Sequence, residues 1–213
     1  MNDLAVMNKQ FEYESIEKRF SIISSRFKGN IMITTSGGKN SSVLLHLVKK
    51  YLPLDNVFIV FVDTGYYPQS TYKTIQHYIN EGLPISIYSS SMTPNFFESI
   101  YGSPYALNSK DFELFQSIIK HEPLNRAINK INSSIWINGA KRFDTNKREQ
   151  MNFFEEKNGI IQVHPILDWS EEEIRKLIKD NNLYTNSEHY DITKEINEHK
   201  ECNILYRCGK KKL

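Results

Sequence analysis

The stretch Ser36–Ser42 (SGGKNSS) combines two glycines and three serines with a lysine and an asparagine. The apolar run Ile31–Thr34 before it is typical of a buried strand, and apolar side chains at helical spacing follow it. Glycines let a backbone approach a ligand closely, and the free N–H groups at a helix N-terminus point toward an anion. The loop suits a phosphate or a sulfate, although a plain glycine-rich turn explains the same residues equally well.

A carboxylate and a hydroxyl follow the next predicted strand. Val57–Val62 is a continuous run of β-branched and aromatic residues, which is typical of a central parallel strand buried on both faces. Asp63, Thr64 and Gly65 come directly after it. Open α/β sheets bind ligands at the carboxyl ends of their strands. Asp63 also fits a turn or a helix N-cap, and we favour a role in ligand binding.

Cations are concentrated after a further predicted strand, Ser134–Gly139. Guanidinium groups bind phosphate or sulfate through two parallel hydrogen bonds, whereas a solvated basic turn needs no ligand. The position at a strand's carboxyl end gives the two interpretations equal weight. The cations are Lys141, Arg142, Lys147 and Arg148.

The chain has two cysteines, Cys202 and Cys208, both near the C-terminus. Either thiolate could be a nucleophile, the two could form a redox pair, or each could be a small buried apolar side chain. Two cysteines cannot supply the four thiolates that usually hold an iron–sulfur cluster. So few cysteines also argue against a disulfide scaffold. We therefore expect a cytoplasmic protein with no metal site.

The composition is typical of one soluble globular domain. The 213 residues are 39% hydrophobic and 24% charged, and the net charge of +2 does not indicate a nucleic-acid-binding surface. We find no apolar run long enough to cross a membrane, and the N-terminus does not resemble a secretory signal.

The elements that must position these residues alternate between strand and helix. Helices are predicted over Phe11–Phe27 and Thr71–Ile79, and a third strand over Ile85–Tyr88. This order predicts an α/β fold with a Rossmann-like, doubly wound, mostly parallel sheet of about five strands, with helices on both faces. Further helices are predicted near Asn95–Tyr101 and over Phe112–Ile131, the second with a break at Pro123. A strand is predicted over Ile160–Ile166, in which His164 has a structural role, and a helix capped by Ser170 and Glu173 follows it. The segment Tyr184–Leu213 is predicted to be an irregular tail.

Five stretches carry a family resemblance in order. SGGKNSS is similar to the SGGxDS phosphate loop of the adenine nucleotide alpha-hydrolase fold, and FVDTGYYPQSTYKTI (Phe61–Ile75) resembles a DTG-Y-x-PETY segment. The other three are HEPLNRAI (His121–Ile128), WINGAKRFDTNKR (Trp136–Arg148) and VHPILDWSEEEI (Val163–Ile174). Together they resemble the phosphoadenosine phosphosulfate (PAPS) reductase family over most of the chain.

The resemblance implies roles for individual residues. It implies an adenine nucleotide domain over residues 1–190 and a cysteine-containing tail over residues 191–213. Asp63, with Thr64 and Gly65, would lie by the ribose or adenine. A cysteine of the tail would attack the sulfonate sulfur, and thioredoxin or glutaredoxin would then release sulfite, with no iron–sulfur cluster. The residues implied to bind phosphate or sulfate are Ser36, Gly37, Gly38, Lys39, Asn40, Ser41, Gly139, Lys141, Arg142 and Arg148.

The chain departs from the family pattern at several places, among them Lys141, which replaces the first arginine of a pair. Asn40 stands where ATP-using relatives carry aspartate, and Cys202 is followed by asparagine where the reductases have glycine. Two alternatives stay open. One is an ATP pyrophosphatase-type adenylating or sulfur-transfer enzyme, which would need Mg²⁺ and which an aspartate at position 40 would favour, and the other is a nucleotide-binding protein without catalysis. The ligand could be PAPS, adenylyl sulfate or ATP. The family resemblance also allows a homodimer.

Overall fold

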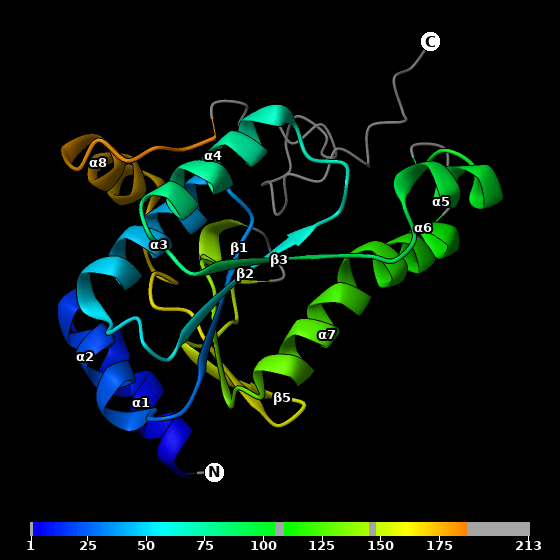
Figure 1. Cartoon of the computed structure of the whole chain (residues 1–213). Coiled ribbons are helices and arrows are strands. Elements are labelled where there is room, and N and C mark those ends of the chain that lie inside the picture. Colours follow the sequence, from blue (N-terminus) through cyan, green and yellow to red (C-terminus); the bar gives the residue numbers. More distant parts are fainter. Residues whose placement is uncertain (1, 105–108, 145–147, 187–213) are drawn as a thin grey trace.

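The computed structural model describes residues 2–104, 109–144 and 148–186. Its centre is a six-stranded sheet in the order β3-β2-β1-β4-β6-β5 (Figure 1). All neighbouring strands are parallel except β5 and β6, which form an antiparallel pair at one edge. The mostly parallel α/β sheet predicted from the sequence is confirmed. The strands are β1 (Ile31–Thr35), β2 (Val57–Asp63), β3 (Ile85–Ser89), β4 (Ile135–Ile137), β5 (Phe154–Lys157) and β6 (Ile160–Val163).

Helices cover both faces of the sheet (Figure 1). Alternate residues of β1 point to opposite faces: Ile31 and Ile33 join a large core with α2, α3 and α8, whereas Met32 packs in a smaller cluster with α7. Within the described residues, no helix is both long and apolar enough to cross a membrane. The helices are α1 (Asn2–Glu12), α2 (Ile16–Arg26), α3 (Lys39–Tyr51), α4 (Gln69–Asn80), α5 (Pro94–Tyr101), α6 (Ser109–Gln116), α7 (Glu122–Ile131) and α8 (Glu171–Asp180).

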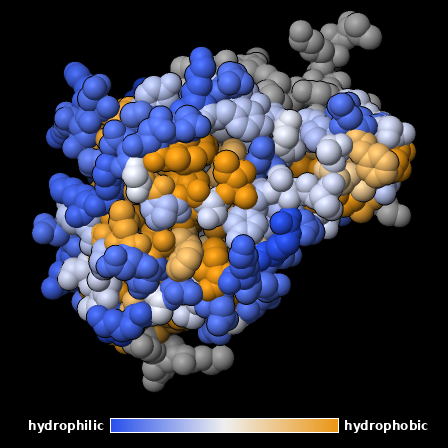
Figure 2. Space-filling model, viewed as in Figure 1, coloured by the Kyte–Doolittle hydropathy of each residue, from blue (hydrophilic) through white to orange (hydrophobic). Residues whose placement is uncertain are grey.

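Helices α5 and α6 project beyond the sheet, at the right of Figure 1. A small core of their own, which includes Phe97 and Phe115, attaches them to the rest of the chain. The outer surface of this projection carries hydrophobic side chains (Figure 2), among them Phe96, Ile100 and Leu114, which are 40–56% exposed. The helix expected near Asn95–Tyr101 is confirmed.

The single helix expected over Phe11–Phe27 is wrong, because the chain forms two helices there. Ser15 lies in extended backbone between α1 and α2, and its side chain accepts a hydrogen bond from the Lys18 N–H. A serine side chain in this position satisfies a free N–H group of the helix that follows it. Phe11 and Phe20 remain fully buried on either side of this turn, so both helices contribute to one core.

The break expected at Pro123 is also wrong. A π-helical turn over Ser117–His121 connects α6 to α7, and Pro123 lies in the first turn of α7. Proline is tolerated there, since the N–H group that it lacks would have no partner inside the helix. The irregularity predicted from the proline therefore lies just before it, as a wider turn and not as an interruption.

The region around β5 and β6 differs from the prediction in two ways. The strand expected over Ile160–Ile166 ends at Val163, because residues 164–167 turn, with the Leu167 N–H donating to the His164 carbonyl. The sequence analysis also missed β5, whose sequence FEEK is mainly charged and is not an apolar run. An edge strand can expose charged side chains. The domain boundary predicted at residue 190 lies outside the described residues.

Candidate functional site

The loop Ser36–Gly38 joins β1 to α3, at the carboxyl edge of the sheet. Gly37 has φ +70°, and a Cβ atom there would lie 3.0 Å from the Thr71 methyl group of α4. Glycine adopts this backbone conformation without strain. The Ser41 hydroxyl donates to the Gly38 carbonyl at 2.8 Å and lies 3.4 Å from the Ser36 hydroxyl. The loop is therefore a tight turn at a helix N-terminus, as a phosphate-binding loop requires.

The chain leaving β4 packs directly against this loop. A Cβ atom on Gly139 would lie 3.2 Å from the carbonyl oxygen of Asn40. A side chain at this position would push the two backbones apart by a few tenths of an ångström, so glycine favours their close approach. This contact brings the basic segment that follows Gly139 to the loop, so the first and third sequence features form one site.

Lys141 is the centre of the charged part of this site. Its side chain is only 2% exposed, and its Nζ lies 3.4 Å from a carboxylate oxygen of Glu171 and 3.7 Å from one of Asp144. The Lys39 ammonium group also donates to Glu171. A buried ammonium group without counter-charges would be strongly destabilising. Asp144 and Glu171 supply these charges.

Asp144 connects the basic segment back to the loop. Its Oδ2 accepts a hydrogen bond from the Asn40 amide at 3.1 Å and lies 3.4 Å from Arg148. Burial raises the pKa of Asp144, although the positive charges of Lys141 and Arg148 oppose this. Burial also acts to raise the pKa of Glu171, but the hydrogen bond and charge of Lys39 outweigh it and lower that pKa.

Arg142 differs from its neighbour Lys141. Its backbone N–H donates to the Leu167 carbonyl, and its Nε donates to the Met151 carbonyl at 3.1 Å. The guanidinium carbon lies 5.1 Å from the centre of the Phe153 ring. These contacts belong to the packing of the chain beyond β4, and they hold the half-buried Arg142 side chain against Phe153. The role of Arg142 in anion binding stays a prediction.

A buried histidine lies close to the charged residues. His164 is 1% exposed, and its Nδ1 lies 2.8 Å from the Asn138 side-chain oxygen, which also accepts the Ala140 N–H. Nδ1 is therefore the protonated nitrogen. Burial, together with the positive charge of Arg148, lowers the pKa of His164 to about 4. The neutral ring holds the turn that carries Lys141. This contact agrees with the structural role predicted for His164.

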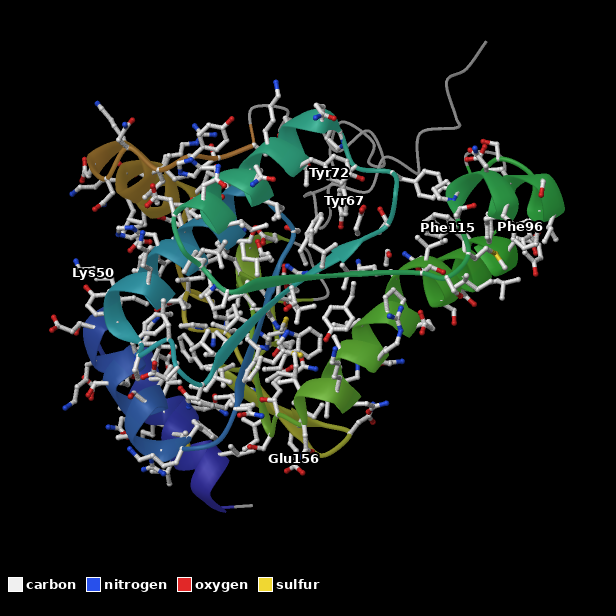
Figure 3. All side chains as sticks on the ribbon, in the orientation of Figure 1. Lys50, Tyr67, Tyr72, Phe96, Phe115 and Glu156 are labelled. Atoms are coloured by element: carbon white, nitrogen blue, oxygen red, sulfur yellow. The ribbon has the colours of Figure 1, made fainter. Side chains whose placement is uncertain are left out.

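The second sequence feature forms the neighbouring part of the edge. The Asp63 carboxylate accepts hydrogen bonds from the Gly65 N–H and the Tyr72 hydroxyl, both at 2.9 Å. The Tyr67 and Tyr72 rings lie beside each other near the end of β2 (Figure 3), with ring centres 5.3 and 6.4 Å from that of Phe61. Burial and the hydrogen bond to Asp63 raise the pKa of Tyr72. Asp63 is thus both a turn former and a carboxylate held at the site.

Gly65 and Thr64 shape the turn around Asp63. Gly65 has φ +75°, and a Cβ atom there would lie 2.6 Å from the Pro94 ring at the start of α5. The Thr64 side chain is buried, and its oxygen accepts the Tyr66 N–H at 3.4 Å. Both residues therefore support the turn. Their predicted nucleotide contacts remain a prediction.

The sequence analysis missed three polar groups of this site, Asp144, Glu171 and Tyr72. Asp144 lies among the predicted cations, where a lone carboxylate was a usable signal. Glu171 was assigned only to a helix start, and Tyr72 only to a helix. Nothing in the local pattern of these two residues indicates that they face Lys141 and Asp63. Cys202 and Cys208 lie outside the described residues, and no three metal-binding side chains cluster in residues 2–104, 109–144 and 148–186.

Comparison with known proteins gives the site a family context. The model of the phosphoadenosine phosphosulfate reductase domain matches residues 30–194. A phosphoadenosine 5'-phosphosulfate reductase from Buchnera aphidicola is 31% identical over 185 residues, which are 86% of this chain and 75% of that protein. A protein of the same name from Synechococcus is 27% identical, over 84% of this chain and 78% of that protein.

Solved structures share the fold. A phosphoadenylyl-sulfate reductase from Candida auris in a phosphate complex has a TM-score of 0.75 and 21% identity, covering 92% of this chain and 93% of that chain. The U34-tRNA thiolase NcsA from Methanococcus maripaludis, with its [4Fe-4S] cluster, has a TM-score of 0.54 and 17% identity, covering 84% of this chain and 67% of that chain. With the family model matching most of the chain, the protein belongs to the phosphoadenosine phosphosulfate reductase family, a family of oxidoreductases, as its motifs indicated.

Proposed function

We propose that this protein is a sulfonucleotide reductase that takes PAPS or adenylyl sulfate and releases sulfite. The observation that supports this most directly is the buried Lys141 ammonium group beside the glycine-rich loop, with Lys39 and Arg148 close to the same carboxylates. Three cations next to a helix N-terminus suit a ligand with adjacent phosphate and sulfate groups. The named reductases at about 30% identity support the same reaction.

The two parts of the edge suggest how the nucleotide lies. The phosphosulfate would occupy the loop Ser36–Gly38 and approach Lys39 and Lys141, and it would displace part of the carboxylate contacts that hold these cations now. The adenosine would lie toward Asp63 and Tyr72, where a carboxylate can accept ribose hydroxyl protons and aromatic rings can contact a base. This orientation points the sulfonate away from the aromatic residues.

The proposed reaction uses a thiolate of the C-terminal segment, Cys202 or Cys208. The thiolate attacks the sulfonate sulfur, a sulfur–sulfur bond forms, and the bond from that sulfur to the phosphate oxygen breaks. The nucleotide leaves as 3'-phospho-AMP, or as AMP when the substrate is adenylyl sulfate. A thioredoxin or glutaredoxin thiolate then attacks the cysteine sulfur, which releases sulfite. A second thiol of the reductant resolves the mixed disulfide, so the reductant ends as a disulfide and supplies the two electrons.

The test is a product assay with three nucleotides. The protein is incubated with PAPS, adenylyl sulfate or ATP, each with reduced thioredoxin, and sulfite, adenine nucleotide and pyrophosphate are measured. We expect sulfite from one of the sulfated nucleotides, and its loss in Cys202→Ser or Cys208→Ser. Sulfite formation that survives both substitutions would exclude the thiolate mechanism.

The same assay decides between the alternatives. Pyrophosphate release from ATP with Mg²⁺ would favour an adenylating enzyme, and tight nucleotide binding without any product would favour a binding protein. A homodimer and a cytoplasmic location stay predictions, and sedimentation of the full chain measures the first of them.

A further inference from the structure

Asn40 is the second residue of α3, and its side chain lies against Asp144. Its amide nitrogen donates to Asp144 Oδ2 at 3.1 Å, which fixes the orientation of the amide because an ionised carboxylate only accepts hydrogen bonds. The backbone carbonyl of Asn40 packs on Gly139, where a Cβ atom would lie 3.2 Å from its oxygen. The backbone is therefore held in place, and the contact with Asp144 depends on the amide side chain.

The amide oxygen of Asn40 has a different environment from the amide nitrogen. Oδ1 is buried, and it accepts no hydrogen bond within the part of the chain that the structure describes. A buried neutral oxygen without a donor is unfavourable, and a buried charged oxygen is far more so. In an aspartate, both atoms would be carboxylate oxygens, and one of them would lie close to Asp144 Oδ2. Such a pair of carboxylates is stabilised only by a shared proton or by a cation.

The two carboxylates beside the loop, Asp144 and Glu171, are paired with cations of the protein. Asp144 lies 3.7 Å from Lys141 Nζ and 3.4 Å from Arg148 Nη1. Glu171 contacts the Lys39 ammonium group and lies 3.4 Å from Lys141 Nζ. A Mg²⁺ ion needs oxygen ligands at about 2 Å, and ammonium groups beside these ligands would repel it. The groups beside the loop therefore do not fit Mg²⁺.

Sulfated nucleotides and ATP differ in the positive charge that they need from a protein. A triphosphate is commonly used with Mg²⁺ bridging its phosphates, and the protein holds this ion through one or two carboxylates. A phosphosulfate carries fewer negative charges, and lysine and arginine side chains can neutralise them directly. The residue beside Asp144 is therefore placed to decide whether the loop holds a metal ion.

We propose that Asn40 is a specificity-determining residue, which excludes a divalent cation from the loop and so selects a sulfated nucleotide over Mg²⁺–ATP. The inference rests on the proposed function, since it assigns the choice of PAPS or adenylyl sulfate to this residue. Asn40 acts by donating to Asp144, which keeps that carboxylate as the counter-charge of Lys141 and Arg148. An aspartate at the same position would create two adjacent carboxylates, which is a ligand set for Mg²⁺.

The first experiment measures whether Mg²⁺ helps the wild-type protein to bind ATP. ATP is titrated into the full chain in a calorimeter, once with excess Mg²⁺ and once with EDTA. We expect binding with Mg²⁺ to be no tighter than binding with EDTA, because the cations of the protein take the place of the metal ion. Tighter binding with Mg²⁺ would overturn the proposal, and this result depends on no variant.

Asn40→Asp should reverse this behaviour. In the variant, Mg²⁺ should tighten ATP binding at least about 10-fold. The affinity for adenosine 3',5'-bisphosphate in EDTA should fall at least about 10-fold, because the added carboxylate repels the phosphates. The same titrations measure both quantities, and circular dichroism shows that the variant is folded. A folded Asn40→Asp protein that responds to Mg²⁺ as the wild type does would contradict the proposal.

Two further variants separate the added charge from the loss of the amide. Asn40→Ala removes the amide without adding a carboxylate, and Mg²⁺ should not tighten its ATP binding. The double variant Asn40→Asp/Asp144→Asn exchanges the two side chains and restores one carboxylate and one amide donor. Mg²⁺ should not tighten ATP binding in this protein either. A 10-fold effect of Mg²⁺ in either control would overturn the role assigned to the contact between Asn40 and Asp144; that threshold is about the gain expected for Asn40→Asp.

Thermal unfolding with saturating ATP gives a second readout, which does not depend on sulfite formation. Addition of Mg²⁺ should raise the Tm of Asn40→Asp by at least about 3 °C and should not raise that of the wild type. Absence of sulfite in the product assay, together with these effects of Mg²⁺, would contradict the proposed reaction and support the role of Asn40. Sulfite formation by a wild-type protein whose ATP binding Mg²⁺ tightens would contradict the role of Asn40 alone.

Discussion

The carboxyl edge of the sheet has two halves with different chemistry. At the ends of β1 and β4, a charged half holds the buried Lys141 between two carboxylates, next to the loop Ser36–Gly38. At the end of β2, an aromatic half holds Asp63 against Tyr72, beside further aromatic rings. A nucleotide has the same division, with anionic phosphates at one end and a flat base and a ribose at the other. The proposed orientation of the nucleotide follows this division.

The charged half pairs its cations with carboxylates of the protein itself. Lys39, Lys141 and Arg148 contact Asp144 and Glu171. An anion bound there would compete with carboxylates, whereas an adenosine in the aromatic half would meet aromatic rings and the Asp63 carboxylate.

The largest effect concerns protonation of His164 beneath the charged half. Its pKa of about 4 in the folded protein lies below the unfolded value of 6.5, so the unfolded state binds more protons between these values. The neutral His164 ring therefore contributes about 3 kcal/mol to the free energy of unfolding. This contribution is complete above pH 6.5 and is lost as the pH falls toward 4. Urea unfolding at pH 7, 6 and 5 should show this loss, with a shallower dependence in His164→Asn. Parallel pH profiles for the two proteins would show that folding does not lower the pKa of His164.

Removal of the Lys141 charge should weaken nucleotide binding about 100-fold, or about 2.7 kcal/mol. Lys141→Met keeps the length of the side chain but leaves Asp144 and Glu171 to repel the anion. Calorimetric titration with adenosine 3',5'-bisphosphate measures the change. An unchanged affinity would show that Lys141 does not contribute to nucleotide binding.

Arg142 provides the matched comparison, because it is the neighbouring cation and faces the core. Arg142→Ala should lower the free energy of unfolding by about 2 kcal/mol, through loss of its contacts with Met151 and Phe153. Its nucleotide affinity should stay within about threefold of wild type. Urea unfolding and the same titration measure both quantities. An affinity loss as large as that of Lys141→Met would show that Arg142 also binds the anion.

In the aromatic half, Tyr72→Phe should weaken nucleotide binding about fivefold, or about 1 kcal/mol. The variant loses the hydroxyl that holds the Asp63 carboxylate. Inorganic phosphate, which lacks an adenosine, should bind equally well to both proteins. A parallel loss of phosphate affinity would show that the two halves are not separate.

The smallest expected effect is a gain in affinity for inorganic phosphate. Glu171→Gln should tighten binding of inorganic phosphate about threefold, because it removes a carboxylate that competes for Lys39 and Lys141. Glu172→Gln, on the next residue of α8, is the control for a general change in charge. Weaker binding in Glu171→Gln would mean that Glu171 orients the lysines and does not compete with the anion.

Local sequence patterns predicted most of the elements that form this site. The strand, loop and helix around Ser36–Ser42 and the strand before Asp63 depend on neighbouring residues, through apolar periodicity and glycine conformation. The order of strands and helices then indicated the parallel sheet, whose carboxyl edge brings these segments together. The capping box of Ser170 and Glu173 was also readable, because its partners are three residues apart.

The sequence by itself determined that an anion loop, a carboxylate and a group of cations meet at one edge of an α/β sheet. Only the tertiary structure decided that Lys141 faces this site while Arg142 faces Phe153, and that Glu171 and Tyr72 belong to it. Lys141 and Arg142 are adjacent and carry the same charge, so the sequence does not distinguish them. The direction of each side chain depends on partners far away along the chain. The contact between Asn186 and Thr71 spans 115 residues, and such contacts follow from the packing of whole elements and not from any local pattern.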